Sequence, residues 1–175
     1  KLKSSGYELT GRAWFAQLPQ LTIGGSYSDL DWKSGGEKDV TMNDIAVFGE
    51  YRIYNETNYG FSATAGWFNR GYTPATPGAE KYTNNYLTLG GKGNYVLMDG
   101  LQAIAGVSYA FNDLFKKESE SKLAIVKGQV GAEYDFAQVP GLKAGAYFLY
   151  EKEASEAEDY TSYGFDLGAS YAVNF

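Results

Sequence analysis

The amino-acid sequence predicts an all-β protein, an antiparallel up-and-down transmembrane β-barrel, and three observations lead to that prediction. Apolar residues alternate with small or polar residues through most of the 175-residue chain. Most of the alternating segments run for about 12–16 residues, against the five or six that are usual for strands of globular proteins. The charges in the middle of these segments fall on the polar face, and the apolar face ends in aromatic residues. Because successive side chains of a strand point to opposite faces, each strand has two different surroundings.

The last strand shows the pattern most clearly. Its apolar face consists of Tyr163, Phe165, Leu167, Ala169, Tyr171, Val173 and Phe175. The intervening residues are small or polar and include Asp166. The same period of two predicts nine strands in a single domain, 1–175, at 6–17, 20–33, 41–54, 59–72, 82–97, 101–115, 122–137, 142–153 and 160–175. Neighbouring strands are predicted to be antiparallel, because no connection is long enough for a crossover.

The predicted connections alternate between short and long. The short ones are 17–20, 55–58, 98–100 and 138–141, and the long, polar ones are 34–41, 73–81, 116–121 and 152–159. Tight turns at one end and longer polar loops at the other give the predicted barrel a direction.

Alternation alone also fits a soluble barrel or sandwich with its apolar face inside. The strand lengths, the position of the charges and the alternating loops favour the membrane. A charge costs about 2–4 kcal/mol on a lipid-facing wall but can meet a partner or water inside. The charges that we predict to line the interior are Glu8, Arg12, Glu50, Arg52, Lys92, Lys127, Glu133, Asp135 and Asp166.

Aromatic residues gather near both ends of the apolar faces, as membrane barrels require at the two lipid–water interfaces. The predicted aromatic girdle consists of Tyr7, Tyr59, Trp67, Tyr109, Tyr134, Tyr150, Tyr163, Tyr171 and Phe175. Inside the barrel, two groups of residues have opposite effects. Gly24, Gly66, Gly106, Gly131, Gly145 and Gly168 favour open space, whereas Trp14, Phe48, Phe68, Tyr147 and Leu149 favour a filled lumen.

Composition excludes several classes of function. The chain has no His and no Cys, so it lacks Ser-His and Cys-His catalytic pairs, thiolate metal sites and disulfides. We expect no enzyme activity, no cofactor and no metal. Acid pairs such as Glu151 with Glu153, or Glu158 with Asp159, are interpreted as solvated loop charges. A net charge of −6 argues against a nucleic-acid partner.

With its final strand 163–175, in which Tyr171 and Val173 precede a terminal Phe175, the chain resembles bacterial outer-membrane β-barrel proteins of the porin-like kind. The alternation of short turns and long loops is similar too. The resemblance implies a Gram-negative outer membrane as the location and the lipid bilayer as a partner. It also implies that barrel assembly machinery engages the C-terminal strand, with short turns in the periplasm and long loops outside.

Nine strands place the two ends of the chain on opposite sides of the membrane, whereas single-chain bacterial barrels have an even number of strands. We therefore expect ten or more strands in the intact barrel, with a strand or segment before Lys1. The function expected first is a passive pore for ions or small solutes, in which the interior charges select ions. The alternative is a closed structural or adhesive barrel that displays acidic loops, in which the charges pair as a polar core. The oligomeric state is not predicted.

Overall fold

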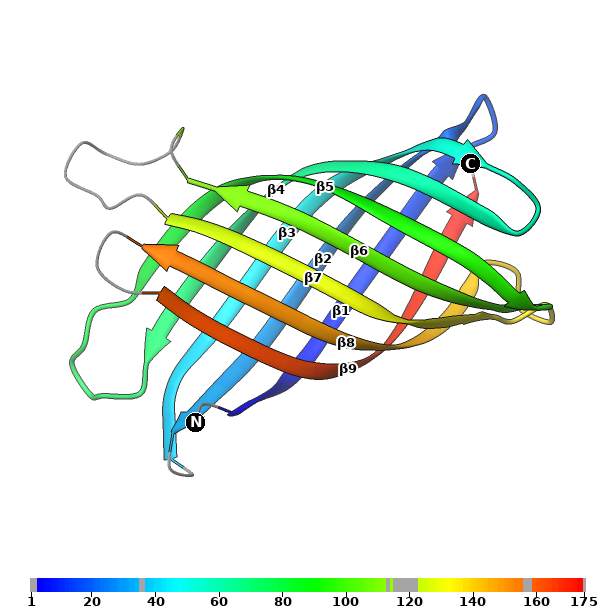
Figure 1. The fold of residues 1–175 in the computed structure, drawn as a ribbon. Helices are drawn as coiled ribbons and strands as arrows, with labels where there is room; N and C mark the ends of the chain where they lie inside the picture. Colours follow the sequence, from blue (N-terminus) through cyan, green and yellow to red (C-terminus); the bar gives the residue numbers. More distant parts are fainter. Residues whose placement is uncertain (1–2, 35–36, 113, 115–122, 156–158, 175) are drawn as a thin grey trace.

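A computed structural model shows a closed β-barrel and describes residues 3–34, 37–112, 114, 123–155 and 159–174 (Figure 1). Its strands are β1 (Lys3–Phe15), β2 (Leu18–Ser34), β3 (Glu37–Asn55), β4 (Tyr59–Pro74), β5 (Tyr82–Met98), β6 (Leu101–Phe111), β7 (Leu123–Asp135), β8 (Leu142–Ser155) and β9 (Asp159–Asn174). The all-β barrel and its up-and-down order, predicted from the alternation, are confirmed. No helix among the described residues is long and apolar enough to cross a membrane.

Each strand pairs antiparallel with the next, and the ring closes through a parallel pair, β1 with β9. The sequence led us to expect ten or more strands, but these nine close without another. The end with the connections at 16–17, 56–58, 99–100 and 136–141 is called the turn end, and the opposite end the loop end. The N-terminus therefore lies at the loop end and the C-terminus at the turn end (Figure 1).

Two of the predicted long loops are mostly strand. β2 continues to Ser34 and β3 begins at Glu37, and β8 continues to Ser155 before β9 begins at Asp159. The prediction at 34–41 and 152–159 was wrong because polar residues can pair across strands as well as form loops. At this height the outer face of the β2–β3 hairpin is joined by polar bonds: the Thr41 hydroxyl donates to Asp31 and the Asn43 amide to Asp29.

The two faces of the sheet differ as the alternation requires. Large apolar side chains on the outer face are exposed, among them Ile45, Val47, Val107 and Val130. The buried apolar cluster lies inside the barrel instead, and consists of Phe68, Tyr86, Ala110 and Ile125. The protein therefore has an apolar outer wall and an interior that mixes aromatic rings with charges.

Candidate functional site in the barrel lumen

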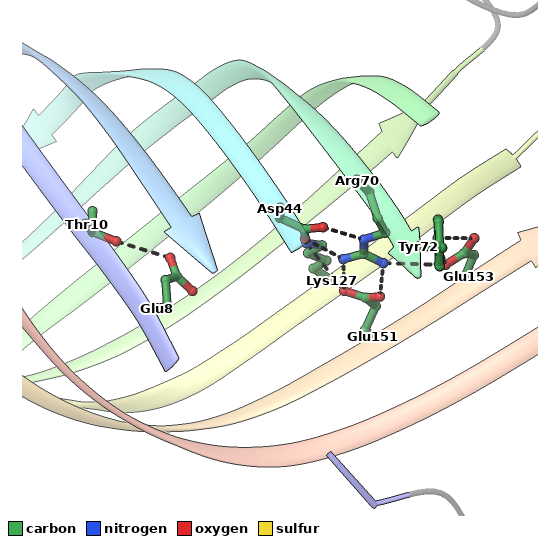
Figure 2. Close-up of polar contacts among 8 residues, drawn as sticks. All are labelled: Glu8, Thr10, Asp44, Arg70, Tyr72, Lys127, Glu151 and Glu153. Atoms are coloured by element: carbon green, nitrogen blue, oxygen red, sulfur yellow. Dashed lines mark hydrogen bonds and ion pairs between the residues drawn. The ribbon is translucent and has the colours of Figure 1, made fainter. Parts of the chain in front are cut away.

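Arg70, on β4, is the most completely buried charge among the described residues, with 1% of its surface exposed. On one side its Nε and Nη2 atoms each donate to Asp44, the neighbouring residue on β3, at 2.8 Å. On the other side Nη1 and Nη2 donate to Glu151 of β8, at 2.6 and 3.1 Å (Figure 2). Two bidentate contacts hold the planar guanidinium between strands that are not neighbours.

Three further side chains complete this group. The Lys127 ammonium lies 3.4 Å from Glu151 and 3.7 Å from Asp44. Glu153 accepts from Arg70 at 3.4 Å, and the Tyr72 hydroxyl donates to both of its oxygens (Figure 2). The Arg70 cluster is hereafter Asp44, Arg70, Tyr72, Lys127, Glu151 and Glu153.

The Arg70 cluster consists of two cross-strand pairs that meet inside the barrel. Asp44 and Arg70 are partners on β3 and β4, and Lys127 and Glu151 are partners on β7 and β8. Aromatic rings pack beside them: Arg70 and Lys127 both lie over the Phe68 ring, which stacks on Tyr86. Charges removed from water are tolerated only when paired in this way. The cluster and these rings together fill this part of the lumen.

A second polar group, nearer the turn end, surrounds Glu133 of β7. Its carboxylate accepts from the Lys92 ammonium at 3.2 Å, the Gln102 amide at 3.1 Å and the Tyr147 hydroxyl at 2.7 Å. The donors come from β5, β6 and β8, so this carboxylate joins strands on both sides of β7. Its position between three donors stabilises the ionised form.

A cavity of about 130 Å³ lies beside the Glu133 group and is bounded by β1, β5, β7, β8 and β9. Its charged lining residues are Glu8, Arg12, Lys92, Glu133, Lys143 and Asp166. These three acids and three bases balance. The space is large enough for several water molecules, since one needs only about 10–15 Å³ on this measure.

Two of the inward glycines, Gly24 and Gly145, make room for aromatic rings. A Cβ added at Gly145 would overlap the Tyr147 ring, and one at Gly24 would overlap the Phe48 ring. At both positions the ring occupies the room that the missing side chain would take. At Gly24 the prediction of open space was wrong, because the sequence does not show which ring lies over which glycine, whereas Gly145 and Gly168 do line the lumenal cavity.

The predicted lumen residues fall into several contacts. Lys127 belongs to the Arg70 cluster, and Lys92 and Glu133 pair directly. Arg12 lies 3.6 Å from Glu50, and Asp135 lies 3.3 Å from Lys143. Glu8 accepts from the Thr10 hydroxyl on its own strand (Figure 2). Arg52 is exposed near the turn end.

The predicted girdle residues that the structure describes lie on the outer wall. Most of them are strongly exposed, including Tyr7, Tyr59, Tyr134 and Tyr171. Tyr109, Tyr150 and Tyr163 are exposed as well, and Trp67 of β4 is half-buried. Phe175 lies outside the described residues.

The interpretation of Glu151 and Glu153 as solvated loop charges was wrong, since both bind Arg70 inside the barrel. Asp44 and Arg70 were missed altogether. The signal that could have found all four is the same period of two. With Phe148 and Tyr150 on the outer face, positions 151 and 153 must point inward, and Phe68 fixes Arg70 in the same way.

The lumen thus offers charge pairing and hydrogen bonding, together with one small polar cavity. Among the described residues, no group of three or more Asp or Glu side chains has the arrangement of a metal site. Comparison with protein-family models and with curated proteins finds no match to this chain.

Proposed function

We propose that this protein is an integral β-barrel of a bacterial outer membrane, with its loop end at the cell surface. The observation that carries the proposal is the inversion of the usual arrangement: apolar side chains cover the outside, while charged residues of the described interior form ion pairs. These eleven residues are Arg12, Asp44, Glu50, Arg70, Lys92, Lys127, Glu133, Asp135, Lys143, Glu151 and Glu153. In lipid only a closed sheet satisfies its backbone, and only an apolar wall is stable.

For the lumen, the geometry favours the closed barrel over the passive pore that the sequence favoured. The Arg70 cluster and the Phe68 and Tyr86 rings fill the loop half, so a solute that entered would have to displace paired charges. The proposed role is a closed structural barrel that anchors its loop-end connections at the cell surface. Assembly machinery would receive it through β9.

The passive pore stays as the second candidate, and the cavity near the turn end favours it. This cavity is polar, charge-balanced and large enough for several waters, so it could form one half of a path for small ions. The pore would require the Arg70 cluster to open.

Two experiments test these proposals. Cells expressing the protein are separated by density, and the outer-membrane fraction is washed at alkaline pH; release of the protein into the wash would refute the integral location. The purified barrel is then recorded in planar bilayers beside Arg70→Ala. A closed barrel predicts a silent wild type and conductance steps only from the variant. Regular steps from the wild type would decide for the pore.

A further inference from the structure

The ring closes through a short contact between β1 and β9. The parallel ladder joins Thr10–Trp14 with Ser170–Asn174. Towards the loop end, Lys3–Leu9 of β1 and Asp159–Ala169 of β9 have no strand partner on this side among the described residues. Figure 1 shows β1 and β9 diverging from the C-terminus towards the loop end. These two unpaired edges are called the seam.

Side-chain exposure identifies the same place independently. The most exposed large apolar side chains in the described strands are Leu167, Phe165, Tyr163 and Leu9, at 80%, 77%, 68% and 65%. All four lie on the outer face of the seam. A side chain on a sheet is normally covered on both flanks by neighbouring strands. Here one flank is uncovered, and the inward Gly164 also has no atom near its would-be Cβ.

Charge gives a third observation. Glu8 of β1 and Asp166 of β9 both line the lumenal cavity beside the seam. Among the described side chains neither forms an ion pair, although Lys92, Lys127 and Lys143 in the same lumen all do. The bases that line the same cavity, Arg12, Lys92 and Lys143, pair with Glu50, Glu133 and Asp135, so the acids at the seam are the ones left without an ion-pair partner among the described residues.

We propose that the seam holds one more β-strand of the same protein, supplied by a segment before Lys1 and antiparallel to both β1 and β9. This inference rests on the proposed membrane location, because water would hydrogen-bond the unpaired backbone N–H and C=O groups of the two edges and lipid cannot. Insertion replaces a five-pair parallel contact with two antiparallel ladders. The strand is inferred from the unpaired edges of β1 and β9, and not from the residue at which the sequence begins.

The edges also define the chemistry of the strand. Its outward residues are apolar, continuing the wall on either side of Leu9 and Leu167. Its inward residues are small or polar, with a Lys or Arg at the height of Glu8 and Asp166. That base would give both carboxylates the partner that the other lumenal acids have.

Supply from the same chain fits the direction of the strands. A strand antiparallel to β1 runs from the turn end to the loop end, and β1 begins at the loop end (Figure 1). A short connection at the loop end would then join the two, as it does for β2 and β3, between which only residues 35–36 intervene. A second copy of the protein would instead have to detach one of its own strands.

Disulfide trapping tests the seam, since the chain has no native Cys. Gly11→Cys with Tyr171→Cys joins residues that are partners across β1 and β9, and Thr10→Cys with Ser170→Cys gives a second pair. Ala13→Cys with Ile23→Cys, partners across β1 and β2, is the matched control. The protein is expressed from its complete gene and oxidised in its membrane. The cross-linked fraction and the intact mass of the chain are then measured.

With the strand in place, β1 and β9 are separated by two inter-strand spacings, about 9.6 Å, too far for a disulfide. We expect both seam pairs to cross-link at least about tenfold less than the control, in a protein heavier than residues 1–175. Seam cross-linking equal to the control overturns the proposal. So does a blocked seam in a protein with the mass of residues 1–175, because the strand then comes from another chain. The control disulfide reports a folded barrel whether or not the membrane location holds.

Discussion

The guanidinium of Arg70 and the carboxylate of Glu151 meet inside the barrel, with N–O distances of 2.6 and 3.1 Å. The two residues are 81 positions apart in the sequence. This contact joins the β3–β4 pair to the β7–β8 pair across the lumen. It is local in space and remote in sequence, so it acts as a brace between opposite walls.

Removing the brace is expected to destabilise the barrel strongly. Arg70→Ala leaves three carboxylates with Lys127 as their only base in the cluster, and breaking a buried pair costs about 3–5 kcal/mol. Urea unfolding in lipid vesicles, followed by tryptophan fluorescence, measures the change. The matched control is Arg52→Ala, because Arg52 is exposed, and a change there is expected to stay within about 0.5 kcal/mol. Equal midpoints for the two variants would contradict the brace.

The acids of the Arg70 cluster are expected to differ in importance. Arg70 and Lys127 supply two positive charges, and Asp44, Glu151 and Glu153 supply three negative ones, which leaves one negative charge in excess. Glu151 contacts two bases, Arg70 at 2.6 Å and Lys127 at 3.4 Å, whereas Glu153 contacts one base, Arg70, at 3.4 Å. Glu151→Gln should therefore cost about 2–3 kcal/mol, and Glu153→Gln less than about 1 kcal/mol. The same urea measurement ranks them, and the reverse order would refute this division of roles.

A double-mutant cycle tests whether Gly145 makes room for Tyr147. A methyl group at position 145 would overlap the ring, and overpacking of this kind costs about 1–3 kcal/mol. Gly145→Ala should lose much of that cost when Tyr147 is replaced by Leu. Gly164→Ala serves as the control, since nothing lies within 4 Å of its would-be Cβ. An unchanged cost in the Tyr147→Leu background would show that the ring is not the cause.

The period of two predicted the barrel and the facing of its strands because each residue reports its own surroundings. Lys92, Lys127 and Glu133 could be placed inside because a charge among outward apolar neighbours can only point inward. Their partners could not be predicted: Arg70 and Glu151 come together only when the sheet curls and closes. That closure depends on registers between strands, which no single segment encodes.

Strand ends were predicted less well for a related reason. Polar residues at 34–41 and 152–159 resemble loops in sequence, yet a strand that continues beyond an apolar wall is polar on both faces. Bonds such as that from Thr41 to Asp31 keep the hairpin paired there. The parallel contact of β1 with β9 was not foreseen, because the local alternation is the same whichever strand lies beside it.

A charge on the outer wall distinguishes a membrane barrel from a soluble one. Val130 is exposed in the middle of β7, with neither a charge nor an aromatic girdle beside it on its strand. Facing lipid, Val130→Lys should cost about 2–4 kcal/mol, and facing water it should change stability by less than about 0.5 kcal/mol. The control is Thr161→Lys, an outward position near the loop end, where the same charge reaches water. Unfolding in vesicles measures both, and equal small effects would place the outer wall in water and remove the basis for the membrane proposal.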